Sequence, residues 1–428
     1  QASYIERARR RNMKPAFLCI NAVITVSLVT PIFGQQILEG KTQPESTLLA
    51  PEQKKVPVLG SVAPENLPPL FPKFTDWLQQ ERIRVYGWLE GGYTHSSAGD
   101  GLLANAPTPN RFGNEGILNG VWLIVERQLV HEGWSWGFRT DFYAGSDAAL
   151  LRPQNGFGPE NDPHWGTDFR QIFLSLHMPL LSEGGVDLQL GRQNVPIGYE
   201  TLMAPYRPMY SETYFWIHYQ VGSTAATAIW HATDQLDILG SLNLGFNTFF
   251  NFRGNGPCYL AKAIYTMGPA RQTTVSAAVY TGPEPFPAAT GHLGSWQTGA
   301  GGGVKHNWSP RLTQEFLVSG SWDFNDPAVN RTSPAYGAFT ILTYHLNQHL
   351  DLNGRGEWFW DKDGARTGKA AHYGEITVGL NIMPSPWINF RPELRGDFAS
   401  DPVFGSVSSN HRERNQFTAA FDVILKFH

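Results

Sequence analysis

The chain has 428 residues, of which 41% are hydrophobic, 16% charged and 13% aromatic, with a net charge of −4 and a pI near 6.4. A soluble domain carries roughly 25% charged residues, so this chain is poor in charge. It offers no basic surface for nucleic acid, and we exclude that class of partner.

Residues 1–34 predict an N-terminal extension followed by a signal peptide. An apolar run, 16–33, follows five basic residues: Arg7, Arg9, Arg10, Arg11 and Lys14. This order is typical of an export signal, and Met13 is a natural start for it. The alternative is a membrane anchor, although a spanning helix needs about 20 apolar residues and this run is shorter. We therefore expect an exported protein.

Residues 35–80 predict a proline-rich periplasmic linker, because seven prolines fall between Pro44 and Pro72. Within it, residues 74–80 form at most a short amphipathic turn. Cys258 is the single cysteine after the signal, so no intramolecular disulfide is expected. No later stretch reaches the roughly 20 apolar residues of a membrane helix. A membrane location would therefore require a β-barrel.

Residues 81–428 predict one all-β domain, a transmembrane antiparallel up-and-down barrel. Apolar and polar residues alternate over segments of about 9 to 14 residues that end at Gly, Pro, Asn or Asp. Roughly 16 such segments are expected. They are 82–95, 118–130, 134–145, 168–178, 185–193, 223–233, 235–247, 258–267, 271–281, 296–308, 311–324, 335–346, 349–361, 373–383, 386–398 and 415–428.

The connections between these segments alternate in length. Six are tight turns: 131–133, 233–234, 267–271, 309–310, 347–348 and 384–385. Eight are long: 96–117, 146–167, 194–222, 248–257, 282–295, 325–334, 362–372 and 399–414. Outer-membrane barrels have short periplasmic turns and long external loops, so this order indicates that class.

The two faces of the later segments differ in polarity. In the last segment Phe417, Phe421 and Leu425 share one face, and Asp422 and Lys426 lie on the other. Such a charged face suits the wall of a wide, water-filled barrel. Ten charged side chains are predicted to line the pore, the arginines balanced by the carboxylates: Arg84, Glu90, Arg139, Asp141, Arg355, Glu357, Arg391, Glu393, Arg395 and Asp397.

The longest connection, 194–222, is the best candidate for a constriction. Prolines and aromatic residues make it stiff and bulky: Pro196, Tyr199, Pro205, Tyr206, Pro208, Tyr210, Tyr214 and Trp216. If it folds inward, Glu200, Arg207 and Glu212 would face the charged wall and set the selectivity of the waist. The alternative is an external loop that lies over its neighbours.

Two short motifs carry a family resemblance. The stretches 87–93 (GWLEGGY) and 118–127 (LNGVWLIVER), with the proline-rich lead-in and the C-terminal aromatic strand, resemble the OmpL-like β-barrel porins over 82–428. The resemblance implies an outer-membrane pore. One departure is that His428 follows the aromatic Phe427, whereas such barrels usually end on the aromatic residue.

The leading interpretation is a pore in the bacterial outer membrane that passes small polar solutes or ions by diffusion. No catalytic or metal-binding motif is found, so no enzyme activity, cofactor or metal is expected. The expected partners are membrane lipid, small solutes and, as in many such barrels, two further copies in a homotrimer. Two alternatives stay open: an outer-membrane barrel hydrolase and a secreted soluble all-β carbohydrate-active protein.

Overall fold

The computed structural model describes residues 61–105, 108–153, 162–194, 200–216, 222–245, 247–251, 256–268, 270–283, 296–326 and 329–428. The predicted signal and residues 35–60 of the predicted linker lie outside these ranges. Within them, no helix has both the length and the apolar character needed to cross a membrane.

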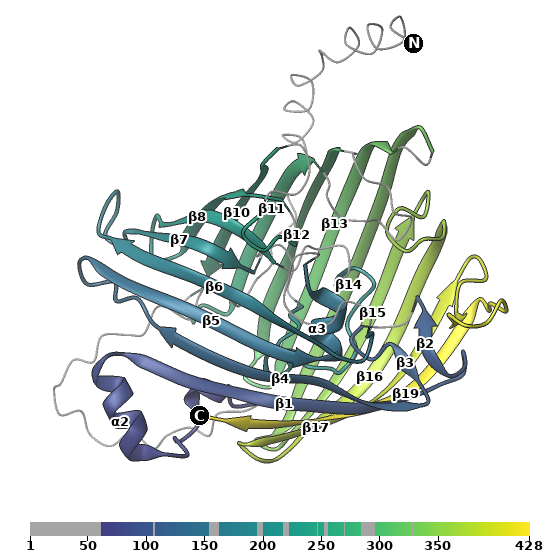
Figure 1. Ribbon diagram of the computed structural model, residues 1–428, viewed down its shortest axis with the longest axis horizontal. Helices are drawn as coiled ribbons and strands as arrows, with labels where there is room; N and C mark the ends of the chain where they lie inside the picture. The colour runs from purple at the N-terminus through teal and green to yellow at the C-terminus, as the bar shows by residue number, and fades with distance from the viewer. Residues whose placement is uncertain are drawn as a thin grey trace, which may run out of the picture. The chain divides into compact units, whose positions relative to one another are not determined.

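Sixteen antiparallel strands close into a barrel (Figure 1). The strands are β1 (Ile83–Ser96), β4 (Glu115–Arg127), β5 (Ser135–Gly145), β6 (Gly166–Met178), β7 (Val186–Gln193), β8 (Ser223–His231), β9 (Leu236–Asn243), β10 (Cys258–Met267), β11 (Thr273–Pro283), β12 (Trp296–Ser309), β13 (Leu312–Asp326), β14 (Arg331–Asn347), β15 (Leu350–Asp361), β16 (Ala371–Ser385), β17 (Ile388–Ala399) and β19 (Asn415–Phe427). Each strand pairs with the next along the chain, and β1 pairs with β19 to close the ring. The predicted fold class and all 16 segments are confirmed.

Small elements decorate the barrel. Strands β2 (Gly101–Ala104), β3 (Phe112–Gly113) and β18 (Gly405–Ser406) form a three-stranded sheet between the first and last long connections. Helix α2 (Pro72–Gln80) precedes β1, and helix α3 (Ser146–Leu151) follows β5. Two single 3-10 turns are η3 (Pro64–Asn66) and η4 (Ala204–Tyr206). The alternation pattern predicts none of the three short strands, because two to four residues carry too little of it.

The strands end where the tight turns were predicted, with one correction at the other end of the barrel. A long loop was expected over 325–334, but only residues 327–330 separate β13 from β14. Both strands run further than the apolar pattern indicates, and their pairing shifts register between Asp323 and Asp326 so that Asp326 faces Arg331. Backbone pairing thus extends past the end of the apolar alternation.

The outer and inner faces of the barrel have opposite character. Leu394 is 56% exposed, Phe417 48% and Leu425 46%, and all three point outward. The alternate positions Arg391, Arg395 and Asp422 are buried. A soluble β-sandwich would bury its apolar face between two sheets, whereas here that face is the outer surface. The soluble alternative is therefore wrong.

The described part of the predicted linker contacts the short-turn end of the barrel. The inward-facing Lys426 donates to the carbonyl of Val62 (2.7 Å), and Asn389 donates to the hydroxyl of Ser61 (3.0 Å). The backbone N–H of Leu70 donates to the carbonyl of His428 (2.7 Å). Helix α2 and the C-terminus lie at this same end (Figure 1). Residues 61–70 are thus held at the inner edge of the barrel mouth.

Candidate functional site: a segment that crosses the barrel

We call residues 200–216, the described part of the longest connection, the crossing segment. The connection to which it belongs joins β7 to β8 in the chain, yet the contacts of the segment lie on β1, β15 and β17. Six strands separate β8 from β15 in one direction round the ring, and five separate β7 from β17 in the other. The segment therefore spans the interior to the opposite wall.

Two wall carboxylates hold the backbone of the crossing segment. Glu357 on β15 accepts the N–H groups of Tyr214 and Phe215, both at 2.7 Å. Glu393 on β17 accepts the N–H groups of Tyr210 and Ser211 at 3.1 Å. Buried N–H groups need a partner, and a segment without regular structure cannot supply its own. The wall supplies them through the two carboxyl groups.

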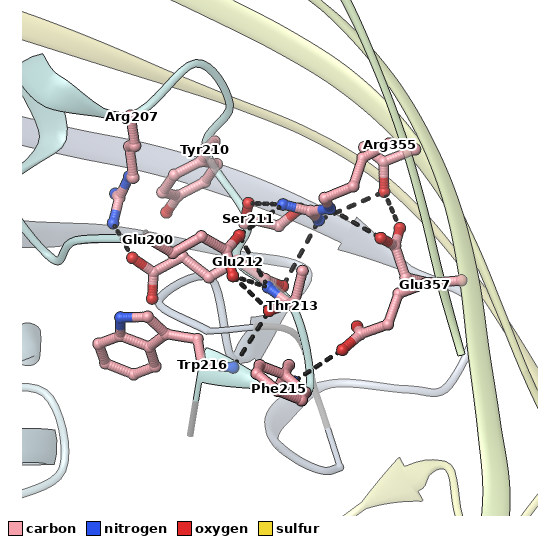
Figure 2. Close-up of polar contacts among 12 residues, drawn as sticks. Glu200, Arg207, Tyr210, Ser211, Glu212, Thr213, Phe215, Trp216, Arg355 and Glu357 are labelled. Atoms are coloured by element: carbon pink, nitrogen blue, oxygen red, sulfur yellow. Dashed lines mark hydrogen bonds and ion pairs between the residues drawn. The ribbon is translucent and has the colours of Figure 1, made fainter. Parts of the chain in front are cut away.

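Three wall arginines hold the carbonyl groups of the same segment. Arg391 donates to the carbonyls of Ala204 (3.0 Å) and Arg207 (2.8 Å), and Arg395 donates to that of Glu212 (2.7 Å). Arg355 donates to the carbonyl of Ser211 and to its hydroxyl (2.9 Å). Figure 2 shows Arg355 and Glu357 reaching from the wall to this stretch. Charges of both signs on the wall thus satisfy both kinds of backbone group.

The three predicted constriction residues lie in this interface. Glu200 pairs with Arg355 at 3.3 Å, and Arg207 pairs with Glu90 on β1. Glu212 pairs with Arg207 at 3.3 Å within the segment. Burial acts to lower the pKa of Arg207, but Glu90 and Glu212 outweigh it and raise the pKa. Arg207 therefore stays charged and bridges the segment to the wall.

Apolar contacts complete the seat of the crossing segment. On the inner face Trp88, Trp122 and Tyr143 stack with ring centroids 5.0 and 4.5 Å apart. Leu202 and Trp216 belong to the same buried cluster. A second buried cluster takes in the rings from the tip of the segment and from the wall strands: Tyr214, Phe215, Phe339, Phe359 and Tyr373. Apolar side chains on the inner face of the wall therefore pack against the apolar side chains of the crossing segment.

Asp147 in helix α3 is a buried carboxylate of another loop that interacts electrostatically with Arg207 of the crossing segment. It is 1% exposed. Burial raises the pKa of Asp147 to about 7, although Arg207 acts to lower it. The charge of Asp147 therefore changes close to neutral pH.

The ten predicted pore-lining residues all lie on inward-facing positions, but they differ in exposure. Arg84 and Arg139 keep 22% and 15% of their side-chain surface exposed. The other eight are buried: Glu90, Asp141, Arg355, Glu357, Arg391, Glu393, Arg395 and Asp397. Seven of those eight bond to the crossing segment directly. The seventh is Asp397, which accepts a hydrogen bond from the hydroxyl of Tyr214 at 2.7 Å. Most of the predicted set thus anchors the segment.

Three carboxylates of the wall are absent from the ten predicted pore-lining residues. Arg84 and Arg139 pair with Glu126, Arg355 pairs with Glu375 (2.7 Å), and Arg391 pairs with Asp422 (2.9 Å). All three lie on the polar face of their strand. The same alternation that selected the arginines could have found them, but pairing between neighbouring strands depends on register, which the sequence leaves open.

A cavity of about 490 Å³ lies between the crossing segment and the short-turn end. Glu200, Tyr206 and Arg207 line it on the segment side, and Ser61 and Glu65 line it from the N-terminal residues. The wall contributes a mixed set of side chains: Arg84, Gln128, Lys305, Thr313, Glu315, Ile341, Thr343, His345, Asp351 and Asn381. Of the ten predicted pore-lining residues, Arg84 is the one that reaches this cavity.

Three solved structures resemble this barrel. The outer-membrane channel DcaP of Acinetobacter baumannii superposes with a TM-score of 0.54 at 10% identity, over 81% of this chain and 97% of that one. The anion-selective porin from Comamonas acidovorans gives 0.54 at 10%, over 81% and 99%. OmpF of Salmonella typhi, in complex with daunomycin, gives 0.53 at 14%, over 81% and 97%. At these identities the likeness shows the fold alone.

The family assignment comes from the sequence. No curated protein sequence matches the chain. One family model does match, over residues 82–427, which take in every strand of the barrel. The chain belongs to the family described as "Putative beta-barrel porin-2, OmpL-like", and it is a β-barrel porin of the bacterial outer membrane.

Proposed function

We propose that solutes diffuse through this porin past a waist formed by the crossing segment, and reach the periplasm through the cavity beneath it. A 16-stranded barrel is wide enough to hold an aqueous channel, so an unobstructed interior would be a broad pore. A segment fixed across that interior narrows the route.

The observation that carries this proposal is the attachment of the segment to the wall opposite its own strands. Glu357 and Glu393 each accept two consecutive backbone N–H groups, and Arg391 and Arg395 donate to its carbonyls. A loop that merely lay over the barrel mouth would contact the ends of the strands. The anchoring residues lie instead within β15 and β17.

The cavity supports small polar solutes without strong preference for one charge. Four carboxylates line it, on Glu65, Glu200, Glu315 and Asp351, against three cationic side chains, on Arg84, Arg207 and Lys305. Opposed charges of similar number polarise the lining but leave little net field for selecting ions. We therefore propose a general diffusion pore and expect a reversal potential near zero in a salt gradient.

We propose that transport involves no covalent step and that the barrel works as a homotrimer. We also propose that residues 35–80 lie in the periplasm, since residues 61–70 contact the short-turn end, which faces the periplasm in outer-membrane barrels.

The test is single-channel conductance in a planar bilayer. In the variant, residues 201–215 are replaced by a Gly-Ser linker short enough to follow the wall from β7 to β8. We expect the conductance to rise about twofold or more, because the full lumen of a 16-stranded barrel then opens. Heat-modifiable electrophoretic mobility verifies that the variant is folded. A folded variant that conducts like the wild type would contradict the proposal.

A further inference from the structure

Three histidines and two aspartates meet at the short-turn rim, far from the anchors of the crossing segment. His131 lies in the turn between β4 and β5, His177 near the end of β6, and Asp187 near the start of β7. His231 ends β8, and Asp237 lies at the start of β9. Backbone pairing sets His177 opposite Asp187 and His231 opposite Asp237. Three successive hairpins thus bring together residues that are distant in sequence.

The carboxylate of Asp187 is the centre of this cluster. It lies 2.6 Å from Nδ1 of His177 and 3.2 Å from Nε2 of both His131 and His231. Ligand atoms of His131, His177 and Asp187 all lie within 4.8 Å of one another. A tetrahedral zinc ion with bonds of about 2.0–2.2 Å holds its ligand atoms roughly 3.5 Å apart. Small side-chain shifts would bring these three to that spacing.

The hydrogen bonds of His231 leave a place for a cation. Its Nδ1 lies 2.7 Å from Asp237, while its Nε2 faces Asp187. A neutral imidazole donates from one nitrogen only, so two carboxylates require either a second proton on His231 or another positive charge beside Asp187. His177 is fully buried, and its Nε2 has no hydrogen-bond partner. The cluster is thus rich in nitrogen donors and incompletely satisfied.

We propose that a divalent transition metal of the Zn²⁺ class binds here, with His131, His177 and Asp187 as its protein ligands. Imidazole and carboxylate are ligands that this class of metal accepts, and three protein ligands leave a position for water. His231 acts as a positioning residue that fixes Asp187, and Asp237 fixes His231 in turn, as carboxylates do around metal-bound histidines. The side chain of His131 is 22% exposed, so the site is open to solution.

Bound metal would brace the barrel at its periplasmic rim. Its ligands belong to the β4–β5 turn and the β6–β7 hairpin, and the positioning pair belongs to β8 and β9. Because a metal ligand must be deprotonated, binding would also replace protons held by the histidines.

The proposal is tested by metal titration of the full-length, folded protein without a polyhistidine tag. The protein is stripped with a chelator, titrated with Zn²⁺ by calorimetry, and analysed for retained zinc after gel filtration. We expect one equivalent per chain. His177→Ala and Asp187→Asn should lose it. Asp237→Asn should bind roughly 10–100-fold more weakly, as when other residues that hold metal-site side chains in place are changed.

The matched control is His345→Ala. His345 also pairs with a carboxylate, Asp351, at 2.6 Å on the inner wall, but belongs to no cluster of this kind among the described residues. This variant should bind zinc like the wild type. If His177→Ala fails to fold, His131→Gln in the turn provides the loss-of-ligand variant. Folded wild-type protein that retains no zinc, or cluster variants that bind as well as His345→Ala does, would overturn the site.

Discussion

The seat of the crossing segment and the short-turn rim are both lined by charged residues on the inner face, yet they differ in hydration. At the seat, Arg391 and Arg395 are 1% exposed, and both make ion pairs and donate to backbone carbonyls of the crossing segment. At the rim, Arg84 and His131 each keep 22% of their side-chain surface exposed. The same polar alternation thus builds a fixed, buried network where a segment covers it. Where no segment covers the wall, the charged side chains stay in contact with water.

The largest expected difference between the two regions is in stability. Arg391→Ala removes the partner of Asp422 and the donor to two carbonyls of the segment, of which that of Ala204 keeps the N–H of Arg207 (3.4 Å). Breaking a buried pair from one side costs about 3–5 kcal/mol. Arg84→Ala, at the rim, should cost about 1 kcal/mol or less, as for solvated pairs. Urea unfolding of both variants in lipid vesicles measures the two losses of stability. Equal losses would contradict the proposed difference between the two regions.

The sequence predicts the barrel well because each strand carries its own signal. The segment predicted at 258–267 is β10 as observed, and Arg391, Glu393 and Arg395 face inward as the alternation on their strand requires. The alternation of apolar and polar residues can be recognised within one strand, without knowing which strands pair with it. The small strands β2, β3 and β18 are too short to carry it.

The partners of the charged residues were not predictable in the same way. Glu357 meets Tyr214 across 143 positions, and the rim cluster draws on three hairpins. No local rule relates such positions, since the contact depends on the path of an irregular segment and on strand register. The predicted wall charges lie on inward-facing positions, and their role in holding a backbone came from the structure.

A second, smaller effect concerns charge inside the buried region. The pKa of Asp147 is raised from its ordinary 3.8 to about 7, so the folded protein favours the neutral carboxyl. The contribution of Asp147 to folding stability should then be highest below pH 4 and fall as the pH rises to about 7. Asp147→Asn removes this dependence, so its stability should exceed that of the wild type by a margin that widens from pH 4 to pH 8. Unfolding midpoints across this range measure the margin, and parallel pH profiles would contradict it.

The smallest expected effect is at a hydrogen bond between the crossing segment and the N-terminal residues at the short-turn end. The hydroxyl of Tyr206, on the crossing segment, donates to Glu65 at 2.6 Å. Tyr206→Phe removes that bond, which is worth about 1 kcal/mol, and leaves the ring in place. Backbone hydrogen exchange should become faster over residues 61–67 and stay unchanged at 210–216. Faster exchange at both places would mean that the regions are not separable.

The central claim is that wall carboxylates hold the crossing segment in the pore, and single-channel conductance of Glu357→Ala/Glu393→Ala tests it most directly. Asp361→Ala is the matched control, because Asp361 lies on the same face of β15 and accepts the backbone N–H groups of Arg366 (2.9 Å) and Thr367 (2.8 Å) in a different loop. The account predicts larger, less steady conductance steps for the double variant and wild-type steps for the control. Wild-type steps from a folded double variant would contradict it.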